Sequence, residues 1–197
     1  MDWTCLQYND LPQDELDQAE MEGIDLSYEP GRTHRVSMQF DGSGGRVNPF
    51  YDWVPNGGGA FSMQIAATEN CNSCHDPLNF HGGNRIEMEY CVTCHNAGTT
   101  DADSTNTLDM KVMIHKIHYG ENLTNLPYAI YGFNDNEHDY SNLVYPQDIR
   151  NCVNCHVGSG TVGDRTDLTV TSQGDNWAEV PSSAACGSCH DDLDFST

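Results

Sequence analysis

Eight of the nine cysteines fall into four C-x-x-C-H units, each of which places two thiols three residues apart directly before a histidine. The units are Cys71, Cys74 and His75; Cys91, Cys94 and His95; Cys152, Cys155 and His156; and Cys186, Cys189 and His190. Two thiols at this spacing can each form a thioether to one of the two vinyl groups on a porphyrin edge, and the adjacent histidine then lies under the iron as an axial ligand. The spacing therefore predicts four covalently attached c-type haems.

Zinc binding and thiol–disulfide exchange are the competing explanations for paired cysteines. A tetrahedral zinc site does not require a histidine directly after every second cysteine, and thioredoxin-like chemistry has no use for four such units in one small chain. The remaining cysteine, Cys5, is expected to be an unpaired or buried structural residue, with an intermolecular disulfide or a lipid attachment as the alternatives.

Five histidines lie outside the four units, namely His34, His81, His115, His118 and His138. An iron with two axial imidazoles needs one further histidine for each haem, so four of these five are enough to make every iron six-coordinate. Methionine is the alternative sixth ligand, and it raises the reduction potential, whereas two histidines keep the potential lower. Because enough histidines are available, the seven methionines are expected to serve in packing.

His115 and His118 lie in the segment TLDMKVMIHKIHYG, which is the best candidate for a helix in this sequence. Thr107 is expected to be the N-cap of this helix, and Gly120 is expected to end it. Residues three apart project from neighbouring positions on one helix face, so the two histidines can serve two different haems.

The other three histidines outside the units have different surroundings. His81 stands between the first two units and precedes Gly82 and Gly83, a pair that allows the backbone to turn close to a haem face. His138 lies in a polar loop that runs into an extended segment before the third unit. His34 lies in a strand-like region 37 residues before the first haem cysteine, where it can fold back, serve no iron, or reach a haem of a neighbouring copy. Which of His34 and His138 is the spare histidine stays open.

The composition predicts a loop-rich protein with a small core of its own. Hydrophobic residues make up 37% of the 197 residues and 18 are glycine, so the flat apolar face of haem is expected to supply the missing core. A formal net charge of -22 with only 8 Lys and Arg argues against a nucleic-acid partner and against a basic membrane-surface helix. No stretch is long and apolar enough for a transmembrane segment, and the acidic N-terminus is unlike a signal peptide, so Met1 is interpreted as the first residue of a mature or truncated chain.

Two regions follow from the positions of the units. Residues 1–66 hold no haem motif and are expected to form an extended or β-containing N-terminal arm, in which segments 34–40 and 60–67 alternate well enough to be short strands. Residues 67–197 are expected to form a tetrahaem domain that is mostly irregular, with short helices around a chain of haems. The units begin 20, 61 and 34 residues apart, which excludes a regular repeat.

The segments CNSCHDPLNFHGGNRIEMEYCVTCHN, DMKVMIHKIHYG and YPQDIRNCVNCH together resemble the haem domains of outer-surface decahaem c-type cytochromes of metal-reducing bacteria. The resemblance covers roughly residues 69–157. It implies that His81 of the H-G-G motif, and His115 and His118 of the M-I-H-K-I-H motif, are distal iron ligands. The haem domains of that family carry five haems each, and no histidine follows His190 here to serve the last haem.

Chain length and haem count also resemble those of the small tetrahaem cytochromes that polymerise into extracellular conductive filaments. In such a filament a histidine of one subunit can ligate a haem of the next subunit. This second resemblance implies that role for His34.

Four haems with two imidazoles each leave no open coordination position, so the predicted function is electron transfer and not enzymatic catalysis. The chain is expected to be the subunit of a conductive filament, a homopolymer outside the cell or at its surface that exchanges electrons with other redox cytochromes or extracellular acceptors. The alternatives are a monomeric surface or periplasmic electron shuttle and a multihaem reductase. The reductase is disfavoured because the chain has neither a C-x-x-C-K motif nor a dinucleotide fingerprint.

Overall fold

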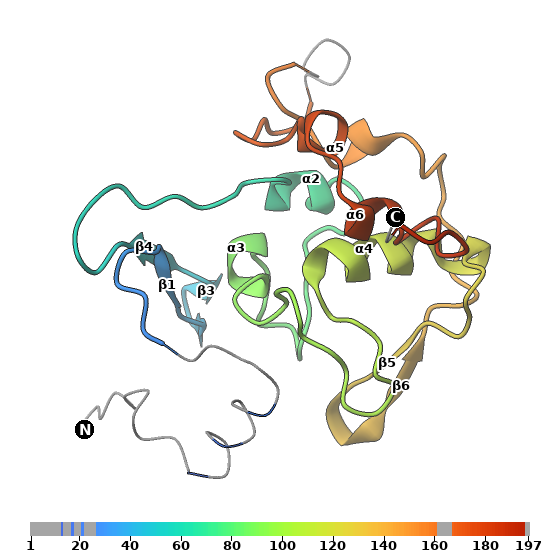
Figure 1. The fold of residues 1–197 in the computed structure, drawn as a ribbon, viewed down its shortest axis with the longest axis horizontal. Coiled ribbons are helices and arrows are strands. Elements are labelled where there is room, and N and C mark those ends of the chain that lie inside the picture. The colour runs from blue at the N-terminus through green and yellow to red at the C-terminus, as the bar shows by residue number, and fades with distance from the viewer. Residues whose placement is uncertain (1–12, 14–16, 18–20, 22–26, 161–166, 196–197) are drawn as a thin grey trace. The chain divides into compact units, whose positions relative to one another are not determined.

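The computed structural model of the chain describes residues 13, 17, 21, 27–160 and 167–195 (Figure 1). The chain divides into two compact units. One consists of residues 1–34 and 52–61, and the other consists of residues 35–51 and 62–197, so that all four C-x-x-C-H units lie in the second. Cys5 lies outside the described residues, and the predicted boundary between residues 66 and 67 stays a prediction.

The strands are short and pair two by two. In the described part of the chain they are β1 His34–Ser37, β2 Phe40–Gly42, β3 Gly45–Val47, β4 Phe50–Trp53, β5 Ala129–Tyr131 and β6 Glu137–Asp139. β1 pairs with β4, β2 and β3 form an antiparallel hairpin, and β5 and β6 form another. In the first hairpin Asp41 lies opposite Arg46 and Gly42 lies opposite Gly45, which leaves a glycine-rich two-residue loop as the sequence indicates.

One of the two strand predictions is wrong. Residues 34–40 contain β1 and the first residue of β2, but residues 60–67 contain no strand. The backbone of this segment bonds to residues 171 and 173, through their side chains and through the amide of Gln173, and does not form a strand ladder. The amide of Gln64 donates to Oε1 of Gln173 at 2.8 Å, and the carbonyl of Ile65 accepts from the hydroxyl of Thr171 at 3.2 Å. An alternating pattern cannot reveal such a partner, because the partner lies more than a hundred residues away in the sequence.

Most helices are a single turn long. They are α2 Thr68–Asn72, α3 Met88–Cys91, α4 Met110–Tyr119, α5 Asn176–Glu179 and α6 Ser183–Cys186, with 3-10 turns η2 Gly120–Asn122, η3 Phe133–Asp135 and η4 Cys152–Asn154. α4 is the longest of the described helices, and α6 packs against it (Figure 1). The predicted short helices and short strands are therefore present.

The two ends of α4 differ in how well the sequence predicts them. Gly120 ends the helix as expected, with a φ of 45°, and a Cβ at this position would collide with the carbonyl of Leu143. The N-cap, however, is Asp109 and not Thr107, because the Asp109 carboxylate accepts from the amide of Lys111 at 3.1 Å. Thr107 lies outside the helix in an isolated β-bridge with Thr100.

The side-chain core is small. The buried apolar residues of the described part are Ala67, Leu78, Met113, Leu123, Tyr128, Ala129, Val157 and Leu168. Several of them surround α4 and the start of β5, where Tyr128 is 1% exposed and its hydroxyl donates to the carbonyl of Thr107 at 2.8 Å. By contrast, Phe61 and Phe133 are 66% and 90% exposed. Within the described residues, no helix is both long enough and apolar enough to cross a bilayer.

Candidate haem sites

The four C-x-x-C-H units have the same backbone geometry, and we number them sites 1 to 4 in chain order. In each unit the amide of the histidine donates to the carbonyl of the first cysteine, at 3.1 Å in site 1 and 3.0 Å in the other three. The amide of the second cysteine donates to the same carbonyl at 3.1 or 3.2 Å. Such a helical turn places both thiols and the imidazole on one side. None of the eight cysteines of these units forms a disulfide.

Three of the four histidines in these units face a second histidine from another part of the chain. The ring centroids are 5.9 Å apart for His75 and His118, 5.9 Å for His95 and His81, and 6.0 Å for His156 and His115. A metal ion between two imidazoles requires about 6 Å, since each metal–nitrogen bond is about 2 Å and each ring nitrogen lies roughly 1 Å from its centroid. Each pair therefore has the spacing that a six-coordinate haem iron needs, and the residues fit the group.

Backbone carbonyls hold the second ring nitrogen of three of these histidines. Nδ1 of His95 lies 3.0 Å from the carbonyl oxygen of Leu108, and Nδ1 of His118 lies 2.8 Å from that of Ile114. Nδ1 of His156 lies 3.4 Å from the carbonyl oxygen of Ile65. A metal-binding histidine commonly donates its second ring N–H to such an acceptor, which fixes the tautomer and leaves Nε2 for the metal. The hydrogen bonds thus leave the nitrogen that an iron would need.

Burial favours the neutral form of four of the six paired imidazoles. It is the largest cause that lowers the pKa of His75, His81, His115 and His156. Two protonated rings of one pair would repel each other, and this lowers the pKa of His75 and His115 further. Only a neutral imidazole can bind a metal ion, so the environment favours the ligand form at neutral pH.

A tight turn presents His81 to site 2. Phe80 and Arg85 pair in an isolated antiparallel bridge, and the residues between them include three with positive φ: 50° at His81, 76° at Gly82 and 94° at Gly83. A Cβ at Gly83 would lie 2.7 Å from Oδ1 of Asn79, so a larger residue would push this turn open. The turn borders a small hollow lined by His81, Arg85, Tyr90, Cys91, Cys94 and His95. This hollow gathers the attachment unit and the second histidine of site 2.

Helix α4 contributes to two sites. His118 faces His75 of site 1, and His115, one turn earlier, faces His156 of site 3. The two rings therefore lie on neighbouring positions of one helix but face histidines of different units. Because the same helix supplies both, sites 1 and 3 are held side by side.

Asn70 joins sites 1 and 3 directly. This residue, which precedes the first cysteine of site 1, is 2% exposed. Its Nδ2 donates to the carbonyls of Cys155 at 3.1 Å and Thr169 at 3.0 Å, and its Oδ1 accepts from the amide of Thr169 at 2.8 Å. The thiols of the two sites are close as well: burial raises the pKa of Cys71 to about 11, and the neighbouring Cys155 adds to the rise.

Sites 1 and 2 are joined at their helices. The hydroxyl of Thr68, the first residue of α2, accepts from the amide of Met88, the first residue of α3, at 2.9 Å. α2 contains Cys71 of site 1 and α3 ends at Cys91 of site 2. The hydrogen bond thus fixes the start of one attachment helix to the start of the other.

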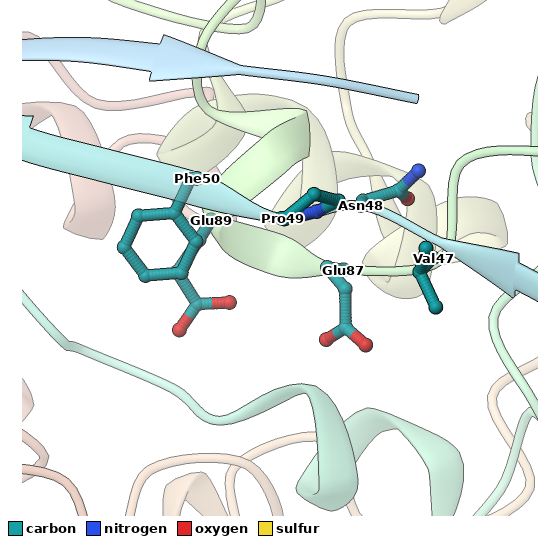
Figure 2. A pocket seen from close by; sticks show the side chains of 6 residues that line it. All are labelled: Val47, Asn48, Pro49, Phe50, Glu87 and Glu89. Atoms are coloured by element: carbon teal, nitrogen blue, oxygen red, sulfur yellow. The ribbon is translucent and has the colours of Figure 1, made fainter. Parts of the chain in front are cut away.

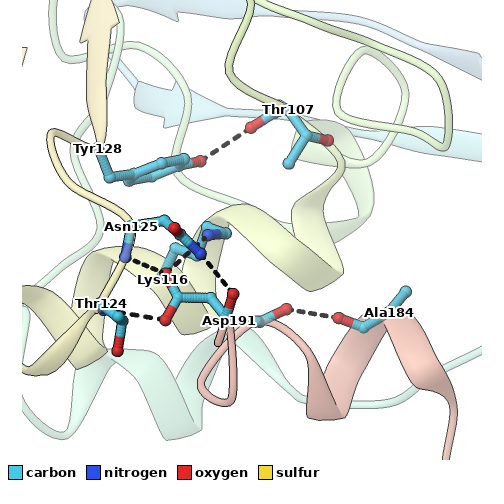
Figure 3. Close-up of polar contacts among 8 residues, drawn as sticks. Thr107, Lys116, Thr124, Asn125, Tyr128, Ala184 and Asp191 are labelled. Carbon is cyan, nitrogen blue, oxygen red and sulfur yellow. Dashed lines mark hydrogen bonds and ion pairs between the residues drawn. The ribbon is translucent and has the colours of Figure 1, made fainter. Parts of the chain in front are cut away.

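Site 4 is attached to α4 through the residue that follows its histidine (Figure 3). The carboxylate of Asp191 accepts from the amides of Thr124 at 2.9 Å and Asn125 at 2.8 Å, and it lies 3.7 Å from Nζ of Lys116 in α4. The side chains of Lys116 and Asp191 are 17% and 5% exposed, so solvent screens this ion pair only weakly. His190 itself is exposed, and no ring contact to another histidine is found for it among the described residues, which include all nine histidines.

The two remaining histidines have other partners. Nε2 of His34 lies 3.1 Å from the carbonyl of Glu29, and its ring lies 5.3 Å from that of Tyr28 and 5.7 Å from that of Trp53. His138 lies in strand β6, which pairs with β5, so the prediction that it lies in a loop is wrong. The chain between the two strands forms a turn. Nε2 of His138 lies 3.1 Å from Nδ2 of Asn136. In both residues Nε2 already contacts another polar atom, whereas the hydrogen bonds of His95, His118 and His156 involve Nδ1 and leave Nε2 for a metal.

A second hollow, of about 380 Å³, lies between the link from β3 to β4 and the start of α3 (Figure 2). It is lined by Val47, Asn48, Pro49, Phe50, Glu87 and Glu89. No cysteine or histidine lines it, so it does not belong to the candidate haem sites.

Sequence reasoning missed the residues that hold the sites together. Asn70 and Thr68 precede the cysteines of site 1, Asp191 follows the histidine of site 4, and Lys116 lies between the two histidines of α4. Their positions next to the ligand candidates were the available signal. Their partners were not readable, because each partner lies far away in the sequence.

Comparisons with known proteins agree with these observations. A family model for outer membrane cytochromes, MtrC/MtrF-like, domains II/IV, matches residues 63–197. The multiheme cytochrome MtrC of Shewanella baltica (strain OS185) is 29% identical over 152 residues, which are 75% of this chain and 18% of that protein. The chain therefore spans less than a fifth of that relative.

Two crystal structures resemble the fold. The outer membrane decaheme cytochrome OmcA matches with a TM-score of 0.72 and 31% identity, over 86% of this chain and 26% of that one. MtrC from Shewanella baltica OS185 matches with a TM-score of 0.55 and 28% identity, over 86% of this chain and 24% of that one. The resemblance to outer-surface decahaem cytochromes is thus confirmed, and haem c is the cofactor that the C-x-x-C-H units would hold. Since the family model covers more than half of the chain, the protein belongs to the MtrC/MtrF-like family of multihaem c-type outer membrane cytochromes.

Proposed function

We propose that the chain binds four haem c groups and transfers electrons between them, outside the cell or at its surface. The observation that carries this proposal is the set of three histidine pairs, whose ring centroids lie 5.9 to 6.0 Å apart beside three of the attachment turns. Haem supplies a one-electron couple, and the protein supplies attachment, axial ligands and the spacing between sites. The outer membrane location in the OmcA description supports the surface assignment.

The proposed attachment residues are the two cysteines of each unit, Cys71 and Cys74, Cys91 and Cys94, Cys152 and Cys155, and Cys186 and Cys189. The proposed proximal ligands are His75, His95, His156 and His190. The proposed distal ligands are His118 for site 1, His81 for site 2 and His115 for site 3, as the ring contacts suggest.

Coordination by two imidazoles argues for electron transfer in preference to catalysis. At sites 1 to 3 both axial positions would be taken by protein, so a substrate would have no iron to bind. We therefore do not assign an enzymatic activity to the chain.

The experiment that tests this proposal is expression with a c-type maturation system, followed by intact-mass analysis and spectroscopy. Four covalent haems are expected. Replacing both cysteines of one unit by alanine should remove one haem each time. Carbon monoxide should not bind the reduced haems of sites 1 to 3, because two imidazoles block the iron. Retention of four haems after removal of a cysteine pair, or carbon monoxide binding at these sites, would contradict the proposal.

At site 4, the second axial ligand would have to come from His34 or His138. His34 and His138 are the histidines left after the three pairs, and in each of them Nε2 would have to leave its present hydrogen bond. Donation of His34 from a second copy would produce the homopolymeric filament that the sequence analysis predicts. A monomeric shuttle is the alternative.

The His34→Ala and His138→Ala variants separate these arrangements. In a filament joined through His34, the His34→Ala variant should stop polymerisation and leave one haem high-spin, while the His138→Ala variant should assemble normally. Discrete particles of the unchanged protein at high concentration, seen by negative-stain microscopy, would rule out the filament.

A further inference from the structure

The turn that presents His81 to site 2 also presents a guanidinium. The bridge between Phe80 and Arg85 closes this turn, with hydrogen bonds of 3.1 and 3.3 Å between the two residues. The buried side chain of Asn48 clamps the backbone on both sides of Arg85: Nδ2 donates to the carbonyl of Asn84 at 2.9 Å, and Oδ1 accepts from the amide of Ile86 at 2.8 Å. Arg85 is thereby fixed in the wall of the hollow that His81 lines.

No carboxylate forms an ion pair with Arg85 in the described part of the chain. Its Nε lies 3.4 Å from Oε1 of Gln39, and its guanidinium carbon lies 5.9 Å from the ring centroid of Tyr90, which also lines the hollow. A second guanidinium, that of Arg46, lies close to the same turn, since a Cβ at Gly83 would come within 3.1 Å of it. In a chain of net charge -22, such an uncompensated positive charge stands out.

The charge of Arg85 lies beside the groups of site 2. Arg85 lines the same hollow as His81, Cys91 and His95, so it belongs to the immediate surroundings of this attachment unit. A fixed positive charge favours the addition of an electron to an iron held nearby, because it stabilises the reduced form.

Among the described residues, the cations near the other sites are exposed or already paired with a carboxylate. At site 4, Lys116 lies 3.7 Å from the carboxylate of Asp191. Near site 3, Arg150, two residues before Cys152, pairs with Asp148 at 2.7 Å, and Lys111 at the start of α4 is exposed.

We propose that Arg85 raises the reduction potential of site 2 above those of sites 1 and 3, which have the same two-imidazole set, so that site 2 holds an electron before them. This inference rests on the proposed function. In the step that it concerns, one electron leaves a reduced haem of a neighbouring site and reduces the haem of site 2. The donor becomes oxidised, and no bond or proton changes. Arg85 affects the reduction potential through its charge and is not a ligand of the iron.

The test uses the haem-loaded full chain and follows each haem by electron paramagnetic resonance during a potentiometric titration. A His81→Met variant, in which only the distal residue of site 2 is changed, identifies the signal of site 2. Arg85→Gln removes the charge at similar size, and Arg85→Lys keeps it. Arg150→Gln is the matched control, because this exposed arginine is already paired with Asp148 at 2.7 Å and does not line the hollow of site 2.

In the unchanged chain, the signal of site 2 should disappear before those of sites 1 and 3 as the potential is lowered. In Arg85→Gln its midpoint should fall by at least a tenfold change in the reduction equilibrium, about 59 mV for one electron. Arg85→Lys should keep most of the midpoint, and Arg150→Gln should leave it unchanged.

Two kinds of failure can be told apart. If the His81→Met change alters no haem signal, the ligand assignment in the proposed function is wrong. If that signal is present but Arg85→Gln does not move it, or if site 1 or site 3 is reduced first, the inference is overturned while the proposed function stands. Should Arg85→Gln fold poorly, loss of charge at Arg46 by Arg46→Gln provides a second measurement, with a smaller shift of the same sign expected.

Discussion

Replacing Asn70 by alanine should destabilise the protein and loosen sites 1 and 3 together. The side chain is 2% exposed and makes three hydrogen bonds to the backbone of Cys155 and Thr169. Each such bond contributes about 1 kcal/mol net, and the backbone groups left behind would be buried without partners. We therefore expect a loss of about 3 kcal/mol in the free energy of unfolding, which for a chain of this size lowers the melting temperature by about 9 °C.

The measurement is a urea or thermal melt of the haem-loaded protein, followed by circular dichroism. Asn122→Ala is the control, because Asn122 is exposed and makes one hydrogen bond of 3.2 Å to the carbonyl of Tyr119. This control should change the free energy of unfolding by less than about 0.5 kcal/mol. If Asn70→Ala costs no more than Asn122→Ala, Asn70 does not hold the two sites together and the argument fails.

Three further predictions concern ligand geometry, acid stability and site 4. The two imidazole planes are 81° apart at site 1 but only 36° and 34° apart at sites 2 and 3. In electron paramagnetic resonance, the haem of site 1 should therefore give a highly anisotropic low-spin signal, and those of sites 2 and 3 should give rhombic signals. Three similar signals would refute this geometry. Asp101 is 6% exposed, and hydrogen bonds from the amides and hydroxyl around it outweigh burial and lower its pKa. The ionised Asp101 therefore contributes its full stabilisation above its usual pKa and loses it as the pH falls through the lowered value. Asp101→Asn should lower the free energy of unfolding at pH 7. The variant should also show a smaller decrease in this free energy between pH 7 and acidic pH than the unchanged protein. Lys116→Met removes the cation beside the 5% exposed Asp191 and should lower the free energy of unfolding by about 2 kcal/mol in a denaturant melt, whereas Lys111→Met on the exposed side of α4 should have little effect.

The attachment turns and α4 could be predicted from the sequence because their signals are local. A C-x-x-C-H unit contains its own backbone hydrogen bonds, and the helix that carries His115 and His118 ends at Gly120 as its pattern indicates. The pairing of histidines could not be predicted, because it depends on the tertiary placement of segments such as the turn at His81. Nor could the failed strand at residues 60–67 be foreseen, since its backbone bonds to residues 171 and 173, which lie more than a hundred residues away in the sequence.

The arrangement around α4 limits how far an electron would have to travel. Side chains three residues apart on a helix have Cβ atoms about 5 to 6 Å apart. If His115 and His118 are the distal ligands, the haems of sites 1 and 3 would be held by side chains from neighbouring positions of one helix, so an electron would pass between adjacent groups.

The same helix also determines where the remaining sites attach. Lys116, between the two histidines, pairs with Asp191 beside His190 of site 4, and Thr68 of α2 joins site 1 to site 2. Site 1 therefore has direct contacts to both site 2 and site 3, while site 4 is held by α4. A chain with so few buried apolar side chains can keep these spacings only if the polar contacts of Asn70, Thr68 and Asp191 fix the attachment turns to one another.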